Sequence, residues 1–316
     1  MADAVLLLAH GTPDRVEEIP EYLLRVTGGR PLPEAAVEEV KHRFAAIGGS
    51  PLTQLTLEQG RLLAQQIGLQ VYVGMRNWKP YIADVVRAMR ADGITRAVTI
   101  CLAPQNSRTS VGLYRRAVLA AGQDSSRGSA ENAAEGTLDL RFIEHWAEHP
   151  LLADAFAEKL RATRDPWSKE AGAPIPVLFT AHSVPVRTVE PQTENDSPDP
   201  YAEQAKLTAR LVAERVGLAP GSWLFAFQSQ GMSGGPWLGP TVEDTLTTLR
   251  EKGVTQLIIQ PIGFLCDHVE ILYDIDIGFR EYGAKLGMAV RRPETLNSSR
   301  LLTQALADLA RRELAR

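Results

Sequence analysis

The sequence contains little cysteine and no long apolar run. Its 316 residues include only Cys101 and Cys266, which excludes a disulfide framework and an iron–sulfur cluster bound by about four thiolates. We expect both thiols to be buried and inert. No stretch of about 18 apolar residues occurs, so no integral membrane segment is expected. The apolar run Ala4–Ala9 follows no basic residue and is too short for a signal peptide, which indicates a cytoplasmic protein.

The sequence also lacks an excess of charge of either sign. Lysine and arginine total 34 against 38 acidic residues, and a net charge of −4 gives no general attraction to nucleic acid or anionic lipid. Apolar residues make up 44% of the chain, which is typical of a globular protein. A chain of this length exceeds what one hydrophobic core usually organises, so two domains are expected.

Short apolar runs alternate with amphipathic segments, a pattern typical of parallel sheets covered by helices on both faces. Apolar residues at helical spacing predict helices over Tyr81–Arg90 and Val242–Lys252, which stop before Gly93 and Gly253. The polar segment Gly122–Gly136 predicts a solvated loop. The predicted strands are Val5–Leu8, Val71–Val73, Ala97–Leu102, Leu140–Ile143, Val177–Thr180, Trp223–Phe227 and Leu257–Pro261.

The two halves of the chain repeat one another. Leu6–Pro13 (LLLAHGTP) is echoed by Leu178–Pro185 (LFTAHSVP), and both read as an apolar strand that ends near Ala-His. A repeat at this domain-sized spacing predicts a duplicated α/β unit, and therefore two similar α/β domains with parallel sheets. Ligands of such sheets bind beyond the carboxyl ends of the strands, where His10 and His182 are expected. If the domains face one another, these histidines line an active-site cleft between them.

The segment Phe264–Asp276 (FLCDHVEILYDID) carries the strongest chemical signal. If it becomes helical after Leu265, three carboxylates lie at i, i+3 and i+7 on one face, namely Asp267, Glu270 and Asp274. Such a row repels itself unless it is solvated, paired with cations or used to bind a metal ion. A solvated helix face is the usual explanation of such a row of carboxylates. Here, however, the apolar run just before the segment predicts a strand, which would place the segment at the ligand-binding edge of the sheet.

The glycine-rich segment Gly231–Pro240 (GMSGGPWLGP) matches neither of the common phosphate-binding patterns. Its two prolines also lack the amide donors that a phosphate loop needs. We interpret the segment as a shaped wall for a flat ligand, on which Trp237 provides the stacking surface.

Seven motifs, in order along the chain, resemble the ferrochelatases, which insert ferrous iron into a porphyrin. These motifs are AHGTP, IGGSPL at Ile47–Leu52, YVGMRNWKPYI at Tyr72–Ile82, LAPQNS at Leu102–Ser107, AHSVP, PWLGP and GFLCDHVEILYDID. The resemblance implies an α/β protein of two similar Rossmann-like (flavodoxin-like) domains with parallel sheets and a porphyrin cleft between them. The same resemblance implies a porphyrin substrate and no cofactor, because Fe²⁺ is itself a substrate. It also implies that the C-terminal helix, about residues 297–316, joins the first domain. We therefore expect an N-terminal domain over 1–148 with that helix, and a C-terminal domain over 149–296.

The resemblance assigns His182 and Glu270 to metal binding and catalysis. His182 matches the histidine of the AHS-x-P motif, and Glu270 matches the glutamate of DH-x-E. An imidazole and a carboxylate can hold a divalent ion loosely and accept the two protons that the porphyrin loses, and which group takes the protons is left open. One further family carboxylate is replaced here by Gly278. A supporting path for protons or iron is expected to comprise Asp267, His268 and Asp274.

The region before the IGG motif is short and polar, which resembles the soluble family members that use coproporphyrin III, a ring with four propionates. Arg43 would bind a propionate through its forked guanidinium, and Arg30 lies near Thr27, where those members have another arginine. His10 replaces a tyrosine that coordinates iron, so we expect His10 to approach the iron of the product. The expected porphyrin-binding residues are His10, Arg30, Arg43, Ser50, Tyr114 and Trp237.

Three alternatives stay open at this point: a protoporphyrin IX ferrochelatase, a cobaltochelatase of related fold, and a non-catalytic haem carrier. The porphyrin preference and the metal preference separate the first two from an enzyme that inserts iron into coproporphyrin III. Tight haem binding without metallation would indicate the carrier. No nucleic-acid partner is expected, whereas the oligomeric state, the iron donor and a transient contact with a downstream haem-pathway enzyme are left undetermined.

Overall fold

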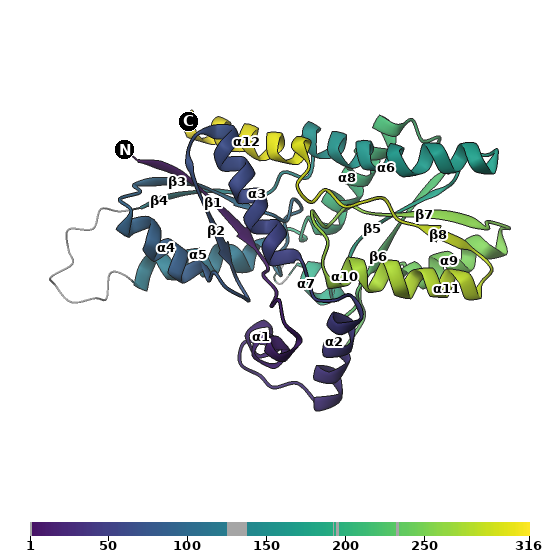
Figure 1. Cartoon of the computed structure of the whole chain (residues 1–316), viewed down its shortest axis with the longest axis horizontal. Coiled ribbons are helices and arrows are strands. Elements are labelled where there is room, and N and C mark those ends of the chain that lie inside the picture. Colours follow the sequence, from purple (N-terminus) through teal and green to yellow (C-terminus); the bar gives the residue numbers. More distant parts are fainter. Residues whose placement is uncertain (1, 125–137, 192, 194–195, 232–233) are drawn as a thin grey trace. The chain divides into compact units, whose positions relative to one another are not determined.

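The computed structural model describes residues 2–124, 138–191, 193, 196–231 and 234–316 (Figure 1). The chain divides into two units, each with one four-stranded parallel sheet. Unit 1 comprises Met1–Pro104, Ser110–Trp146 and Asn297–Arg316, and unit 2 comprises Gln105–Thr109 and Ala147–Leu296. These two sheets confirm the predicted α/β class with two similar Rossmann-like domains.

Unit 1 has the strand order β2-β1-β3-β4. Alternate side chains of β1 pack against α4 and α5, and the opposite face of the sheet carries α3 and α12 (Figure 1). Its elements are β1 (Asp3–Ala9), η1 (Val16–Glu18), α1 (Ile19–Val26), α2 (Glu34–Ala46), α3 (Leu52–Ile67), β2 (Gln70–Met75), α4 (Ile82–Ala91), β3 (Arg96–Cys101), α5 (Val111–Asp124), β4 (Asp139–Ile143) and α12 (Arg300–Leu314).

Unit 2 repeats this topology with the strand order β6-β5-β7-β8. Residues of α9, α10 and α11 pack on one face of the sheet, and α6 and α8 cover the other (Figure 1). Its elements are α6 (Pro150–Ala171), β5 (Val177–His182), α7 (Val186–Val189), α8 (Tyr201–Val216), β6 (Trp223–Gln228), α9 (Val242–Glu251), β7 (Gln256–Pro261), α10 (Val269–Leu272), the π-helix η3 (Asp274–Phe279), α11 (Arg280–Lys285) and β8 (Ala289–Arg291).

All seven predicted strands are present, within a few residues of the predicted bounds. The two predicted helices correspond to α4 and α9, and each ends just before a glycine with positive φ, Gly93 at 74° and Gly253 at 84°. Both cysteines are buried, as expected, and burial raises the pKa of the Cys101 thiol. Of the predicted loop Gly122–Gly136, the first three residues belong to the end of α5, and the rest lie outside the described residues.

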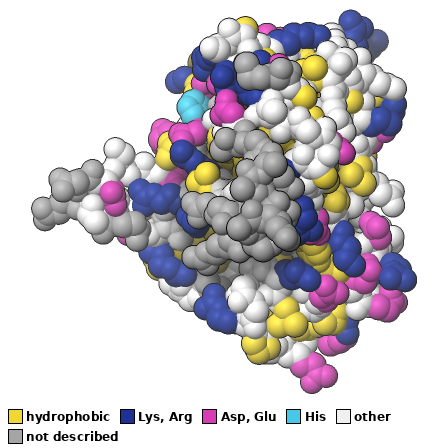
Figure 2. Space-filling model, turned by 90° about the vertical axis from the view of Figure 1, so that its left-hand side faces the viewer, with side chains coloured by type: hydrophobic (Ala, Val, Ile, Leu, Met, Phe, Trp, Pro, Cys, Tyr) yellow, Lys and Arg dark blue, Asp and Glu magenta, His cyan; other side chains and the backbone are white. Residues whose placement is uncertain are grey.

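Charged side chains of both signs lie on the face of the molecule shown in Figure 2. Among the described side chains visible in Figure 2, basic and acidic groups are interspersed, which agrees with the small net charge. Within the described ranges, none of the helices combines the length and apolar character needed to cross a bilayer.

Candidate metal site and its surroundings

His182 is the last residue of β5, at the carboxyl end of the sheet in unit 2. β5 pairs with β6 on one side and β7 on the other, and its preceding side chains are fully buried, which fixes the position of the strand end. The Tyr201 hydroxyl donates a hydrogen bond to the His182 carbonyl at 2.8 Å. The imidazole Nδ1 contacts the carbonyl of Ser183 and is therefore the protonated nitrogen of the neutral ring. The lone pair of Nε2 is left available for a metal ion or a proton.

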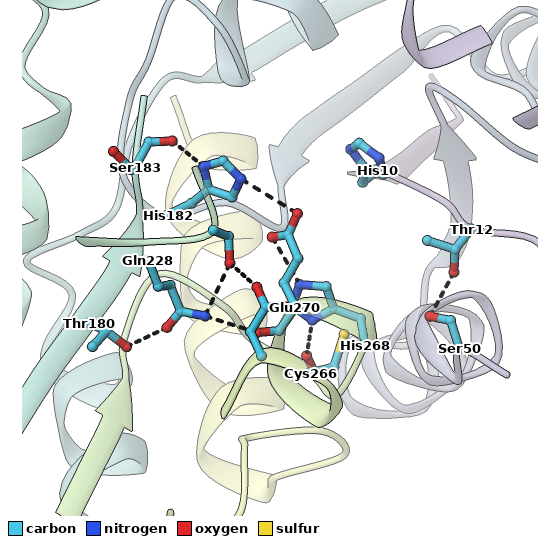
Figure 3. A network of polar contacts seen from close by, with 12 residues as sticks. His10, Thr12, Ser50, Thr180, His182, Ser183, Gln228, Cys266, His268 and Glu270 are labelled. Atoms are coloured by element: carbon cyan, nitrogen blue, oxygen red, sulfur yellow. Dashed lines mark hydrogen bonds and ion pairs between the residues drawn. The ribbon is translucent and has the colours of Figure 1, made fainter. Parts of the chain in front are cut away.

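Glu270 faces His182 from the segment that follows β7, and His268 of the same segment contacts the Glu270 carboxylate (Figure 3). His268 has an extended backbone directly before α10, and its Nδ1 donates to the Cys266 carbonyl at 3.0 Å. The Nε2 atoms of both histidines consequently point at one carboxylate. His182 Nε2 lies 3.5 Å from Glu270 Oε1, and His268 Nε2 lies 3.6 Å from Oε2. Two imidazoles thus flank a single glutamate.

His182 and Glu270 alter one another's ionisation. Burial favours the neutral imidazole, but the Glu270 carboxylate outweighs it and raises the pKa of His182 above its ordinary value. Burial likewise opposes the charge on Glu270, yet His182 and His268 hold the pKa of this carboxyl well below its usual range. The side chains of His182 and Glu270 are 34% and 35% exposed, so a metal ion can reach them. An ionised carboxylate beside a titratable imidazole can attract a cation and exchange protons.

The carboxyl end of β6 holds the backbone of Glu270 in place. Gln228, the buried last residue of β6, accepts a hydrogen bond from the Thr180 hydroxyl at 2.7 Å and donates one to the Glu270 carbonyl at 2.9 Å (Figure 3). After β7 the chain passes so close to β5 that a Cβ on Gly263 would lie 3.0 Å from that of Ala181. Sequence reasoning missed Gln228, although its place at a strand end was a usable signal.

The three predicted carboxylates do not share one helical face. α10 begins at Val269, so Asp267 precedes the helix and lies 3.3 Å from the Arg292 guanidinium. Asp274 accepts a hydrogen bond from the Ser229 hydroxyl at 2.5 Å. The prediction of a single face is wrong because the chain is still extended at His268 and becomes a π-helix from Asp274. The supporting roles of Asp267, His268 and Asp274 stay predictions.

His10 follows β1 directly, at the carboxyl end of the sheet in unit 1. Its Nε2 lies 2.8 Å from the Tyr22 hydroxyl, and the Asn77 amide lies 3.2 Å from Nδ1 and 3.1 Å from Nε2. The Asn77 backbone N–H also donates to the His10 carbonyl at 2.9 Å. These partners are neutral groups. An approach of His10 to iron stays a prediction, and it requires the Tyr22 hydroxyl to release Nε2.

The two arginines predicted to bind propionates are solvent-accessible. Arg43 lies on α2, where its Nε donates to Glu39 at 2.8 Å, and both side chains are substantially exposed. Arg30 is exposed beyond α1, and its Nε donates to the Thr27 carbonyl at 3.3 Å. Because exposed ion pairs contribute little stability, Arg43 can exchange Glu39 for a ligand carboxylate at small cost.

The other predicted porphyrin contacts are less accessible. Ser50 is buried and accepts a hydrogen bond from the Thr12 hydroxyl at 2.9 Å. Tyr114, on α5, is buried in the hydrophobic core of unit 1, and burial raises its pKa. Trp237 is half-buried, and its ring lies 2.9 Å from where a Cβ on Gly231 would stand. The binding roles of these residues stay predictions.

Among the residues that the structure describes, no group of three or more His, Cys, Asp or Glu side chains is arranged to hold a metal ion. Glu270 instead contacts two histidines, His182 and His268, and these three side chains are the candidate metal ligands. A metal ion there would have few protein ligands, which suits a metal that is passed on rather than retained.

Comparison with known proteins identifies the family. The model of the ferrochelatase family matches residues 2–314. A ferrochelatase of Acidobacterium capsulatum is 64% identical over 99% of this chain and 95% of that protein. A coproporphyrin III ferrochelatase of Geobacillus kaustophilus is 32% identical over 96% of this chain and 94% of that protein. The structure of SirB from Bacillus subtilis with Fe³⁺ has a TM-score of 0.58 at 12% identity, covers 100% of this chain and 96% of that one, and shows likeness of fold alone. The chain therefore belongs to the ferrochelatase family, the lyases that insert iron into a porphyrin.

Proposed function

We propose that this enzyme inserts ferrous iron into coproporphyrin III, with iron as a substrate and no resident cofactor. The observation that carries the proposal is the meeting of His182, Glu270 and His268 at the carboxyl end of the unit 2 sheet. Relatives named coproporphyrin III ferrochelatases, at 31–33% identity, support the choice of porphyrin.

The chemistry of insertion follows from the donor set. Fe²⁺ enters a ring that must lose two pyrrole protons, so the site has to attract a cation and accept protons. Glu270, held ionised by the two imidazoles, supplies the negative charge, and Nε2 of His182 supplies a lone pair. We assign His182 to metal contact and proton acceptance, and Glu270 to the opposing contact.

Supporting residues extend this site along the chain. Asp274, which begins η3 and is hydrogen-bonded to Ser229, is proposed to pass protons or iron to or from Glu270. His268 contacts the same carboxylate and is proposed to belong to the same path. Asp267 is ion-paired with Arg292, so any share it has in this path is indirect.

The propionates are proposed to bind residues of unit 1. Coproporphyrin has four of them, and exposed guanidiniums are suited to hold carboxylates through paired hydrogen bonds. Arg43 and Arg30 meet this requirement. Ser50, Tyr114, Trp237 and His10 complete the proposed porphyrin-binding set.

The deciding experiment is anaerobic metallation by the purified protein, followed by absorbance, with Fe²⁺ and either coproporphyrin III or protoporphyrin IX. Faster turnover of coproporphyrin, with a higher KM in Arg43→Ala than in wild type, is the expected result. Faster turnover of protoporphyrin would refute the proposed substrate. Faster insertion of Co²⁺ than of Fe²⁺ would point to a cobaltochelatase. Tight haem binding without metallation of either porphyrin would point to a carrier.

A further inference from the structure

Arg292 follows the edge strand β8 and binds two separate parts of the segment that carries Glu270. Its Nε and Nη2 donate to the two carboxylate oxygens of Asp276 in η3, at 2.9 and 2.6 Å. Its Nη1 lies 3.3 Å from Asp267, immediately before His268. The Arg292 side chain is only 9% exposed, so these contacts are largely shielded from water. One guanidinium therefore joins both ends of the stretch 267–276.

The stretch between these two carboxylates has little intrinsic stability. α10 has four residues, and the π-helical turn that follows it is a rare conformation. Helices this short do not persist without tertiary contacts. The direction in which His268 and Glu270 point is thus set by tertiary contacts: Gln228 holds the Glu270 carbonyl, and the two ends of the stretch need contacts of their own.

We propose that Arg292 is a positioning residue for iron insertion. Its guanidinium binds Asp267 and Asp276 and thereby orients the turn that carries His268 and Glu270. The inference rests on the proposed role of Glu270 in handling metal and protons. It also gives Asp267 a different part from the predicted one: Asp267 holds the turn through Arg292 rather than binding iron itself.

The geometry requires arginine rather than any cation. The planar guanidinium donates two hydrogen bonds to Asp276, while Nη1, which donates to the Pro293 carbonyl at 3.1 Å, also forms an ion pair with Asp267 at 3.3 Å. A lysine ammonium keeps the charge but is a single point, which cannot reproduce a bidentate contact with one carboxylate while reaching another. Arg292→Lys therefore removes the geometry and keeps the buried charge balanced.

The test compares Arg292→Lys and Asp276→Asn with a matched control, Arg280→Gln. Arg280 lies 3.4 Å from the same Asp276, but its side chain is 47% exposed. For each full-length variant we would measure kcat, KM for Fe²⁺, porphyrin affinity by fluorescence quenching, and Tm. Arg292→Lys and Asp276→Asn are expected to lower kcat/KM for Fe²⁺ about tenfold or more, with porphyrin affinity unchanged and Arg280→Gln like wild type.

Three results would overturn the inference. The first is a wild-type kcat/KM for Fe²⁺ in Arg292→Lys and Asp276→Asn with a lowered Tm. The second is an equal loss of kcat/KM for Fe²⁺ and of porphyrin affinity in these variants, and the third is the same loss of kcat/KM for Fe²⁺ in Arg280→Gln. Should Arg292→Lys fail to fold, Asp276→Asn carries the test alone, since it keeps the size of the side chain. Glu270→Gln, assayed in parallel, separates the two proposals. If Glu270→Gln is active, the proposed site is wrong, whereas inactive Glu270→Gln beside fully active Arg292→Lys and Asp276→Asn refutes only the positioning role.

Discussion

The two sheets place a histidine at the same point but give it different neighbours. β1 and β5 each lie between two parallel partners in matching strand orders, and His10 and His182 stand at their carboxyl ends. His182 faces the Glu270 carboxylate at 3.5 Å. His10 is hydrogen-bonded to the Tyr22 hydroxyl and the Asn77 amide, which are neutral.

This difference indicates that the fold determines where each histidine lies, whereas a neighbouring charged group determines whether that histidine can bind a metal ion or exchange protons. A carboxylate stabilises a proton or a metal ion on the imidazole beside it, and the raised pKa of His182 expresses this attraction. A hydroxyl and an amide orient a ring without adding charge. A duplicated scaffold can in this way carry a reactive histidine in one copy and an orienting or ligand-binding histidine in the other.

The largest effect is expected from removing the charge that distinguishes the two sites. Glu270→Gln keeps the size of the side chain but leaves His182 and His268 without their carboxylate. We expect kcat for iron insertion to fall by about 10²–10⁴-fold, the range for loss of a proton-transfer group. Stopped-time anaerobic assays would measure it, with Glu281→Gln, an exposed glutamate on α11, as the matched control. Near wild-type activity in Glu270→Gln would remove the basis of the comparison.

The same carboxylate should govern the titration of His182. With Glu270 present, His182 keeps its proton to a pH above the ordinary histidine value. In Glu270→Gln the Ser183 carbonyl and Asp274 still favour the charged ring, but the carboxylate that outweighed burial is gone, so the pKa should fall. Because the protonated ring cannot bind a metal ion, the acid limb of the rate profile should move to lower pH with it. Imidazole C–H resonances, assigned with His182→Ala, would report the pKa directly, and an equal pKa in both proteins would contradict this account.

A smaller effect is expected from the neutral site. His10→Ala removes the group predicted to approach the iron of the product, so the absorption spectrum of the iron porphyrin bound to the protein should change. The insertion rate should fall less than in His182→Ala, because the Tyr22 hydroxyl and the Asn77 amide that contact His10 carry no charge. Tyr22→Phe is the matched control, since it releases His10 Nε2 from a 2.8 Å hydrogen bond and keeps the imidazole. An unchanged spectrum in His10→Ala would show that His10 does not bind the iron.

The strands could be predicted because parallel strands buried on both faces read as continuous apolar runs. β8 was not predicted, since three residues with one buried side chain leave no pattern. The positions of His10 and His182 followed from the strand ends. Two similar sheets followed from the repeated Ala-His motif.

The details of the site depended on contacts between distant segments, which local pattern cannot supply. Spacing alone put Asp267 on a face with Glu270, but Arg292, from beyond β8, holds Asp267 before the helix begins. The π-helical turn that begins at Asp274 also changes which side chains share a face. The period of about 3.6 residues in an α-helix, on which the prediction rests, does not apply to such a turn. The place of Gln228 at a strand end indicates where it lies but not which groups it binds, because a single amide has no motif.

The smallest effect concerns the residue two positions after each histidine, Thr12 in unit 1 and Val184 in unit 2. The buried Thr12 hydroxyl donates to Ser50 at 2.9 Å. Ser50→Ala removes this acceptor and should lower the free energy of unfolding by about 1–3 kcal/mol, the cost of an unsatisfied buried group. Adding Thr12→Val, which installs the valine of unit 2, removes the donor too and should restore most of that stability. Urea denaturation of wild type, Ser50→Ala and the double variant measures these changes in the free energy of unfolding. The KM for coproporphyrin separates the two possible roles of Ser50. If Ser50 contacts a propionate, KM rises in the single and the double variant, whereas a purely structural serine leaves KM unchanged in the double variant.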